Sequence, residues 1–254
     1  RVGNMKKNNN SLTGWEVGEI KDKHFPNGYA DNWVIDVKDE IVEYLDYYKS
    51  RFDLNDLKCV LDIGSLNGFE SVFFSDLLDS SVQIHTFEPN PESYTNVSLA
   101  TETIPNIKVH NCAVSDFNGT SEFYVTQQNI GGSSLLKPQH LIKTGNLIDK
   151  INVDVVDLSI WAEKNNVSRV DAMWLDTQGA ELSIFKGMGK LLDNVKIIRV
   201  EAAFKPYYHN QPNKDEIIHF LTVENDFELV DSKVHGETPT SPWEGDFLFL
   251  RNNK

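Results

Sequence analysis

The chain of 254 residues carries 24 Lys and Arg residues against 38 Asp and Glu residues, a formal net charge of −14 at pH 7. Such a charge repels nucleic-acid phosphates and anionic lipid, whose binding depends on clustered basic side chains. The hydrophobic content of 40% suffices for one large α/β domain. No apolar run approaches the roughly 20 residues that cross a bilayer. We therefore expect a soluble domain that binds neither nucleic acid nor membranes.

The cysteines and the N-terminus bear on the compartment. Cys59 and Cys112 each lie in an apolar, strand-like run, which predicts buried thiols and a reducing, cytoplasmic environment. The first residues, with the polar run 6–10, lack the apolar core of a secretory signal. Because the chain starts at Arg1 and not at Met, an upstream domain in a longer protein is an open alternative.

The N-terminal region differs in composition from the rest. Residues 1–14 are rich in Asn and Lys without a hydrophobic period, which is typical of a loosely attached arm. The aromatic, turn-rich segment 15–33 suits either a surface wrap or a lid over a site. Apolar side chains at helical spacing over 37–48 predict an amphipathic helix. The predicted organisation is an arm and helix over residues 1–50, packed on one domain over 51–254.

Beyond residue 58 the chain alternates between strand-like and helix-like segments. Such alternation predicts a parallel sheet covered by helices, with ligands bound at the carboxyl edge of the strands. The predicted strands are 59–63, 82–87, 107–114, 121–126, 153–158, 170–176, 195–202, 227–231 and 246–250, and the predicted helices are 70–78, one from residue 91, 159–164, 180–192 and 214–223. No internal repeat is present in the sequence.

A glycine turn follows the first predicted strand, in the sequence DIGSLNG over residues 62–68. Gly64 allows a close approach of the backbone to a ligand, and the helix after Gly68 presents unpaired N–H groups. The spacing is not the G-x-G-x-x-G of dinucleotide folds. Asp62 would repel a pyrophosphate but attract the ammonium of a methionine moiety. The turn therefore suits a nucleoside cofactor, although an ordinary strand-to-helix turn is the alternative.

A carboxylate ends the second predicted strand. Glu88 lies 20 residues after Gly68, the interval at which an acid at the strand tip accepts hydrogen bonds from ribose hydroxyls. The alternative is that Glu88 only favours the positive N-terminus of the following helix. Together with the glycine turn it favours the ribose role.

At this point the sequence resembles a known family, the FkbM-type methyltransferases, a branch of the class I S-adenosylmethionine-dependent enzymes. The resemblance covers roughly residues 60–250. It rests on four stretches, LDIG at 61–64, FEPNP at 87–91, NCAVSD at 111–116 and LDTQGAE at 175–181. It implies a Rossmann-like class I fold, with a mostly parallel seven-stranded sheet, a final antiparallel strand and helices on both faces. It also implies S-adenosylmethionine as the cofactor.

The resemblance also implies roles for individual residues. Cys112 and Ala113 would line the adenine pocket, and Asp176 would lie near the transferable methyl group. Two positions depart from the family's pattern, because Leu66 stands where a small or amide residue is usual and Gln178 replaces a common Glu. The predicted cofactor-binding residues are Asp62, Gly64, Ser65, Asn67, Gly68, Glu88, Asn90, Cys112, Ala113 and Asp176.

The predicted catalytic residues are carboxylates and a histidine near the same sheet edge. Methyl transfer to a hydroxyl requires alignment and removal of a proton. Asp176, at a strand end, is the first candidate base, Glu201 the second and His209 a third, with His235 as a further loop histidine. Alternatively Asp176 caps a helix and Glu201 forms a structural ion pair. No metal is predicted, although Asp176, Glu201 and Asp246 would be suitable oxygen ligands for a divalent cation.

The predicted acceptor is a hydroxyl on a small molecule or glycan. The aromatic loops at 207–208 and 242–243 offer stacking faces beside polar groups, which suit sugar rings, although loop anchoring is the alternative. The acidic charge disfavours a nucleic-acid or protein acceptor. A non-catalytic cofactor-binding domain with the same fold is the competing hypothesis, and an oxidoreductase is disfavoured by the missing dinucleotide pattern.

Overall fold

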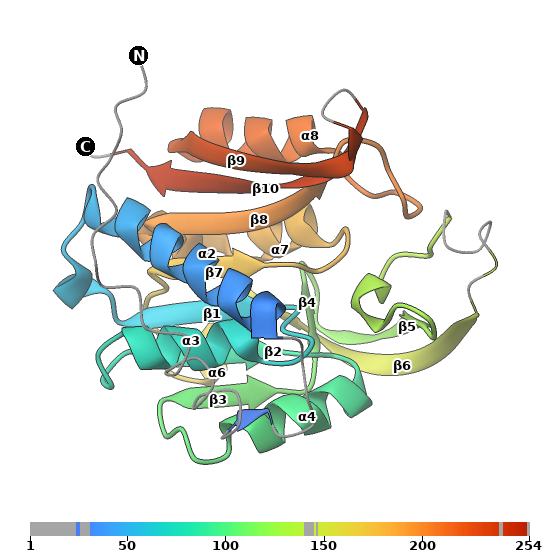
Figure 1. Ribbon diagram of the computed structural model, residues 1–254, viewed down its shortest axis with the longest axis horizontal. Helices are drawn as coiled ribbons and strands as arrows, with labels where there is room; N and C mark the ends of the chain where they lie inside the picture. The colour runs from blue at the N-terminus through green and yellow to red at the C-terminus, as the bar shows by residue number, and fades with distance from the viewer. Residues whose placement is uncertain (1–23, 26–30, 140–144, 146, 239–240, 253–254) are drawn as a thin grey trace.

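The computed structural model describes residues 24–25, 31–139, 145, 147–238 and 241–252 (Figure 1). The predicted arm 1–14 lies outside these residues, as does most of the segment 15–33. Of that segment, His24 Nδ1 lies 2.8 Å from the carbonyl oxygen of Ala100, and the Phe25 ring packs 4.2 Å from the ring of Phe69. These two residues therefore pack on the body of the domain.

The centre of the molecule is a seven-stranded sheet in the order β3-β2-β1-β7-β8-β10-β9. Its strands are β1 (Cys59–Ile63), β2 (Gln83–Phe87), β3 (Ile107–His110), β7 (Ala172–Leu175), β8 (Ile197–Ala203), β9 (Phe227–Thr238) and β10 (Ser241–Arg251). Strand β10 runs opposite to the other six strands, so both of its pairings, with β8 and with the edge strand β9, are antiparallel. All residues of β1 and β7 are buried, as expected for central strands of a parallel sheet that is covered on both faces. The prediction of a mostly parallel sheet with a final antiparallel strand is confirmed.

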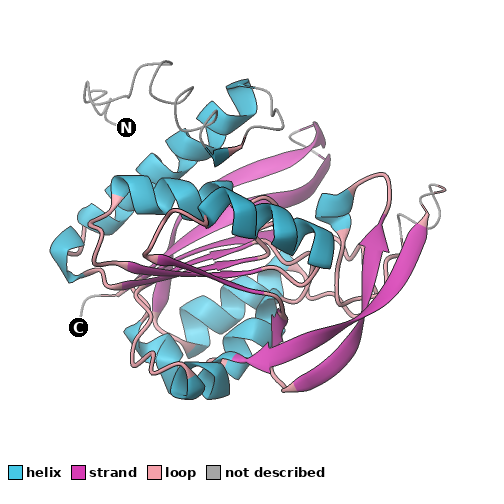
Figure 2. Cartoon of the chain, turned by 90° about the horizontal axis from the view of Figure 1, so that it is seen from below, coloured by secondary structure: helices cyan, strands magenta, loops and turns pink. Residues whose placement is uncertain are grey.

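Helices cover both faces of this sheet, which is the middle layer in Figure 2. One apolar cluster involves α2 (Asp31–Lys49), α3 (Phe69–Leu77) and α4 (Pro91–Thr101). The other involves α6 (Leu158–Lys164), α7 (Glu181–Gly187) and α8 (Lys214–His219). The hydroxyl of Tyr44 in α2 donates to the carbonyl of Met173 at 3.1 Å, so α2 is tied to the sheet itself. None of the described helices combines the length and apolarity that a membrane crossing requires.

Two of these helices begin where their sequence dictates. Asn90 caps α4 by accepting a hydrogen bond from the N–H of Glu92, and Pro91 occupies the first turn. Asn213 and Glu216 form a reciprocal capping box at α8, which continues into a short π-helical turn over Phe220–Glu224.

A second sheet, β4-β6-β5, projects from the carboxyl edge of the main sheet and corrects one prediction (Figures 1 and 2). It consists of β4 (Ala113–Ser115), β5 (Gly119–Thr126) and β6 (Ile148–Asp157). The predicted single strand 107–114 is wrong, because it is divided between β3 and β4. At the break, the Asn111 amide donates to the carbonyl oxygen of Glu88 at 2.9 Å, which turns the chain out of the main sheet.

Other boundaries also differ from the predictions. The helix predicted over 180–192 ends at Gly187, and a 3-10 segment Gly189–Asn194 follows. Gly189 has a left-handed φ of 52°, which interrupts the α-helix. Strands β9 and β10 are longer than the predicted 227–231 and 246–250, because their outer halves pair with each other. The sequence of these outer halves is largely polar, so an apolar pattern does not predict them as strands.

Candidate active site

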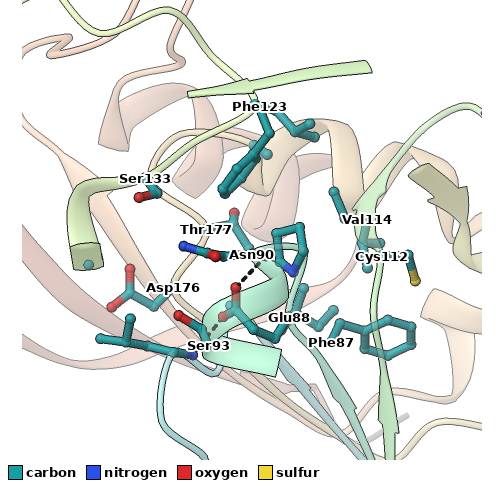
Figure 3. A pocket seen from close by; sticks show the side chains of 18 of the residues that line it. Phe87, Glu88, Asn90, Ser93, Cys112, Val114, Phe123, Ser133, Asp176 and Thr177 are labelled. Atoms are coloured by element: carbon teal, nitrogen blue, oxygen red, sulfur yellow. Dashed lines mark hydrogen bonds between the residues drawn. The ribbon is translucent and has the colours of Figure 1, made fainter. Parts of the chain in front are cut away.

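A cavity opens at the carboxyl ends of β1, β2 and β7 (Figure 3). Residues 130–135, which follow β5, cover one side of it and are called the covering segment below. The space between the lining atoms of the cavity amounts to about 540 Å³, a figure that includes open solvent at its mouth. The lining comes from the two sheets and the loops between them. It comprises Ile63, Gly64, Leu66, Phe87, Glu88, Pro89, Asn90, Ser93, Cys112, Ala113, Val114, Phe123, Ile130, Gly131, Ser133, Leu135, Asp176, Thr177 and Ala180.

The glycine turn after β1 forms the floor of this cavity. Gly64 and Gly68 have left-handed φ angles of 85° and 84°, and Leu66 between them has φ 53°. A Cβ added to Gly64 would lie 1.9 Å from the carbonyl oxygen of Asp176. The turn is therefore packed directly against the end of β7, and glycine is required by both its φ and the lack of space.

Glu88 is fixed by main-chain donors from both sides. Its Oε2 accepts from the N–H of Leu66 and its Oε1 from the N–H of Asn90, each at 2.8 Å. Burial raises the pKa of Glu88 to about 7, while these two N–H groups oppose the rise. Each carboxylate oxygen keeps acceptor capacity toward the cavity, which suits a pair of neighbouring hydroxyls.

Asp62 is close to the cavity but is not among its lining residues. Its side chain is 1% exposed, and Oδ2 accepts from the hydroxyl of Ser71 in α3 at 2.6 Å. Burial raises the pKa of Asp62 to about 6. Its described side-chain contact is therefore with α3 and not with the lining of the cavity. Its predicted contact with an ammonium group stays a prediction.

The other predicted loop residues shape the backbone. Asn67 accepts from the N–H of Phe69 at 3.1 Å, which caps the first turn of α3. Ser65 is buried, and its carbonyl accepts from the N–H of Gly68 at 3.0 Å. Asn90 lines the cavity in addition to capping α4. These residues position the ligand-facing groups by holding the turns around Glu88.

The far end of the cavity from Asp176 is apolar. Figure 3 shows Cys112 and Val114 at this end, Glu88 in the middle and Asp176 at the other end. The Phe123 side chain reaches in from β5. Burial raises the pKa of the Cys112 thiol to about 12, so it is an uncharged wall group. An uncharged, partly aromatic slot is the expected environment for a planar heterocycle.

Asp176 and Glu201 meet at the opposite end, joined by Gln178. The Gln178 Nε2 atom lies 2.8 Å from Asp176 Oδ1 and 2.8 Å from Glu201 Oε2. The hydroxyl of Tyr208 lies 3.1 Å from Gln178 Oε1 and 2.8 Å from the carbonyl oxygen of Gly132. Gln178 has a left-handed φ of 56°, and the hydroxyl of Ser134 donates to its carbonyl at 2.8 Å. The amide therefore links two strand ends to the covering segment.

The same end of the cavity is rich in acidic groups. Burial, and then the charge of Asp176, raises the pKa of Glu201 to about 10. Burial raises the pKa of Asp176 as well. Arg199 pairs with Asp246 at 2.5 Å, and His235 Nε2 lies 2.8 Å from the other oxygen of Asp246. Asp246, one of the three oxygen ligands of the alternative metal site, therefore already contacts the side chains of Arg199 and His235.

His209 lies apart from these contacts. Its side chain is exposed, and its N–H donates to the carbonyl of Lys137 at 2.9 Å. Glu181, next to the predicted site, accepts from Thr177 and from the N–H of Gly179, and so holds the loop after β7. These contacts give Glu181 a structural role in the loop and do not indicate a catalytic one. The role of His209 stays a prediction.

Sequence reasoning missed the wall that the second sheet contributes. Phe123, Ile130, Gly131, Ser133 and Leu135 line the cavity although β5 and the residues after it do not belong to the main sheet. The only signal in the sequence was the GGSS run at 131–134, which indicated a loop but not its place. Leu66, flagged as a departure, lines the cavity opposite this segment.

The strand order, the helices on both faces, the glycine turn after β1 and the acid after β2 together define a class I S-adenosylmethionine-dependent methyltransferase fold. Residues 62–229 match the methyltransferase FkbM domain, and the chain belongs to that family. It is an S-adenosylmethionine-dependent methyltransferase.

The chain is also similar to individual proteins of known sequence or structure. The chain is 26% identical over 204 residues to 2-O-methyltransferase NoeI of Sinorhizobium fredii (strain NBRC 101917 / NGR234), covering 77% of this chain and 79% of the relative. The O-methyltransferase TomG of Streptomyces achromogenes, solved in complex with SAM, has a TM-score of 0.52 and 10% identity over 93% of this chain and 89% of its own. An FkbM methyltransferase from Methylobacillus flagellatus KT gives a TM-score of 0.43 at 14% identity over 76% of this chain. This chain spans 44% of the length of that protein.

The cavity fits S-adenosylmethionine by its own chemistry. Glu88 offers acceptor oxygens for the ribose hydroxyls, and the apolar end beside Cys112 and Phe123 suits the adenine. Gly64 brings the main chain itself to the wall of the cavity, packed against the end of β7. Asp176 lines the remaining end of the cavity, where Gln178 links it to Glu201. The sulfonium cofactor supplies an activated methyl group when bound there.

Proposed function

We propose that this methyltransferase transfers the methyl group to a hydroxyl oxygen of a sugar, glycan or small metabolite. The observation that carries the proposal is the carboxyl pair Asp176 and Glu201, joined by Gln178 at the end of the cavity opposite Cys112. A hydroxyl is too weak an acid to be methylated readily without a base, and a carboxyl pair in a low-dielectric site is suited to accept its proton.

In this mechanism Asp176 accepts the proton, since it lines the cavity, and Glu201 supports it from β8. Gln178 fixes the orientation of both carboxyl groups through its amide. Glu88 and the turn at Gly64 hold the cofactor so that acceptor oxygen and methyl carbon are aligned. The covering segment, bonded to Gln178 through Ser134, excludes water from one side.

The name of one relative supports an oxygen acceptor. NoeI is called a 2-O-methyltransferase, and its similarity extends over most of both chains. The side chains around the proposed acceptor position also fit a neutral, polyhydroxylated compound. Tyr207 and Trp243 offer aromatic faces at the strand ends, and Trp243 is 46% exposed. A phosphorylated acceptor or nucleic acid is disfavoured by the carboxylates gathered here and by the net charge of −14.

A reducing, cytoplasmic environment is part of this proposal. The two cysteines of the chain, Cys59 and Cys112, are both buried, and neither forms a disulfide. Burial raises the pKa of each thiol to about 12, which keeps both unreactive. Fractionation of cells that express the native gene would test the compartment, and recovery outside the cytoplasm would contradict it.

The test is a transfer assay with labelled S-adenosylmethionine on a panel of sugars, glycans and small alcohols, with peptides and RNA in parallel. Labelled product in an ether linkage to an acceptor oxygen is the expected result. Turnover confined to peptides or RNA would overturn the acceptor class. Cofactor binding without turnover on the whole panel would favour a non-catalytic binding domain. Loss of activity on chelation, restored by magnesium, would assign Asp176 and Glu201 to a metal site.

A further inference from the structure

The carboxyl groups of Asp176 and Glu201 are close enough to interact directly. The same Gln178 nitrogen donates one hydrogen to each of them at 2.8 Å. Because one nitrogen atom contacts both groups, the two carboxyls lie next to each other at the ends of β7 and β8. The Gln178 amide supplies hydrogen bonds to them but no positive charge, so it does not offset the repulsion between two ionised carboxylates.

The surroundings do not supply enough positive charge to ionise both acids. Among the described groups that act most strongly on the pair, Arg199 is the one basic side chain, and it is bound to Asp246. Most of the other facing groups are carboxyls, namely Asp62 of β1, Glu70 of α3, Glu181 of α7 and Glu244 of β10. The Tyr208 hydroxyl and the His235 ring of β9, which contacts Asp246, complete the surroundings.

We propose that Asp176 and Glu201 together hold one proton in the cofactor-free protein and release it to solvent when the sulfonium of S-adenosylmethionine lies beside Asp176. Two adjacent buried carboxylates repel each other, so one stays protonated until a cation compensates the second charge. The burial and mutual repulsion that raise the pKa of Glu201 act in the same direction. The inference rests on the cofactor assignment and deepens the proposed base role.

The proton balance of the whole cycle then closes. The pair releases one proton on binding the methyl donor and becomes doubly ionised. During transfer the acceptor O–H bond and the S–CH3 bond break, the O–CH3 bond forms, and the pair takes the hydroxyl proton. The sulfur retains the electron pair of the broken bond, so S-adenosylhomocysteine is neutral at sulfur. Asp176 and Glu201 are thereby returned to their singly protonated state. The base is thus active only while the methyl donor is present.

Proton release is measurable without knowing the acceptor. Titration calorimetry of the full chain with S-adenosylmethionine and with S-adenosylhomocysteine, each in two buffers of different protonation enthalpy, gives the protons exchanged per site. At about pH 7.5 we expect S-adenosylmethionine to release about one-half to one proton more than S-adenosylhomocysteine. Protons exchanged at Glu88 cancel in this difference, because both ligands carry the same ribose. Equal proton counts for the two ligands would overturn the proposal.

Two variants localise the released proton. Glu201→Gln removes one member of the pair, so the difference between the two ligands should fall to less than half of the wild-type value. Glu122→Gln is the matched control, because Glu122 is exposed on β5 and paired with Lys150. It should leave the difference unchanged. A difference that persists in Glu201→Gln would place the proton elsewhere and overturn the inference.

The calorimetric result is independent of the acceptor. Failure of both ligands to bind would contradict the cofactor site at Glu88 and, with it, this proposal. If both ligands bind and release equal numbers of protons, the proposal of a shared proton is contradicted but the cofactor site is not. Normal proton release, combined with transfer only to peptides or RNA, would instead refute the proposed acceptor while leaving the carboxyl pair in place.

Discussion

The two ends of the cavity are built in different ways. At the cofactor end, Glu88 is held by main-chain N–H groups of Leu66 and Asn90, which lie in the turns that flank it. At the other end, Asp176 is held by side chains, through Gln178, from Glu201 and Tyr208. Main-chain donors are independent of side-chain identity, whereas a side-chain network changes with each substitution.

Under the proposed function, the end at Glu88 holds the cofactor and the end at Asp176 faces the acceptor. The main chain would then position the cofactor-binding group, and side chains would position the base. Leu66 and Gln178, the two positions that depart from the resemblance, both have left-handed φ angles, of 53° and 56°. Such conformations cost energy and persist at functional sites where the surroundings enforce them.

The largest expected effect breaks the carboxyl end alone. Asp176→Asn keeps the size of the side chain and one acceptor oxygen but cannot take a proton at neutral pH. Turnover should fall by about 10²–10⁴-fold, while the affinity for S-adenosylhomocysteine changes little. Steady-state kinetics on an identified acceptor and calorimetry on the same preparation measure both quantities.

Two comparisons make that result specific. Glu201→Gln should reduce turnover less than Asp176→Asn if Asp176 is the base, and the reverse order would exchange their roles. His209→Ala tests the third candidate in the same assay. Asp46→Asn is the control, since Asp46 is exposed on α2 and pairs only with Lys49 among the described ion pairs. If neither Asp176 nor Glu201 matters, transfer depends on alignment alone or on a histidine.

The next effect disturbs the contact between the two ends. Gly64→Ala places a Cβ 1.9 Å from the carbonyl oxygen of Asp176, at a residue with φ 85°. We expect cofactor affinity to fall at least about 30-fold and the protein to lose about 2–4 kcal/mol of stability, from overpacking and backbone strain together. Calorimetry and chemical denaturation measure these losses.

Gly145 provides a matched control for that substitution. It has nearly the same φ, 84°, but an added Cβ meets no described atom within 4 Å. Gly145→Ala therefore carries the backbone strain without the collision. If both variants lose the same stability and bind the cofactor equally, the close packing of the turn on β7 is not what makes Gly64 necessary.

A smaller effect isolates the cofactor end. Glu88→Ala removes the acceptor for two ribose hydroxyls, and calorimetry with S-adenosylhomocysteine should show a loss of about 1–3 kcal/mol. Glu92→Ala, at an exposed position of the neighbouring helix α4, should bind as the wild type does. Unchanged affinity in a folded Glu88→Ala variant would remove the ribose role.

The sequence predicts the cofactor end much better than the acceptor end, and the reason is physical. The bounds of β1 and the start of α4 at Pro91 follow from local signals, an apolar run beside a glycine turn and a proline after a capping Asn. Glu88 follows from its spacing to the same turn. All of these features lie within a short stretch of chain, so local chemistry determines them.

The acceptor end and the covering wall depend on contacts between distant segments. The bridge from Gln178 to Glu201 spans 23 residues, and that from Tyr208 to Gly132 spans 76. No local sequence pattern predicts either contact. The break between β3 and β4 was missed for a similar reason, because Asn111 is polar within an otherwise continuous β-like run and acts through the carbonyl of Glu88. Asp176 and Glu201 were found as separate strand-end acids, but their connection was not.

The smallest expected effect is a pH dependence of stability that arises at the acceptor end. Burial raises the pKa of Glu201 from an ordinary value of 4.5 to about 10. Between these two values the folded protein binds a proton that the unfolded chain does not bind. Stability is therefore greatest below about pH 4.5 with respect to this group, and it falls as the pH rises toward the folded pKa. The melting temperature of the cofactor-free protein should fall by a few degrees between about pH 6 and pH 8.5, which scanning fluorimetry can follow.

The net charge of the protein contributes a background trend, so the decisive comparison is with Glu201→Gln, which keeps that background but lacks the titrating group. Its melting temperature should depend less steeply on pH. Parallel curves for the two proteins would show that Glu201 does not retain a proton in the folded state, and the proposal of a proton held at the acceptor end would then have to be abandoned.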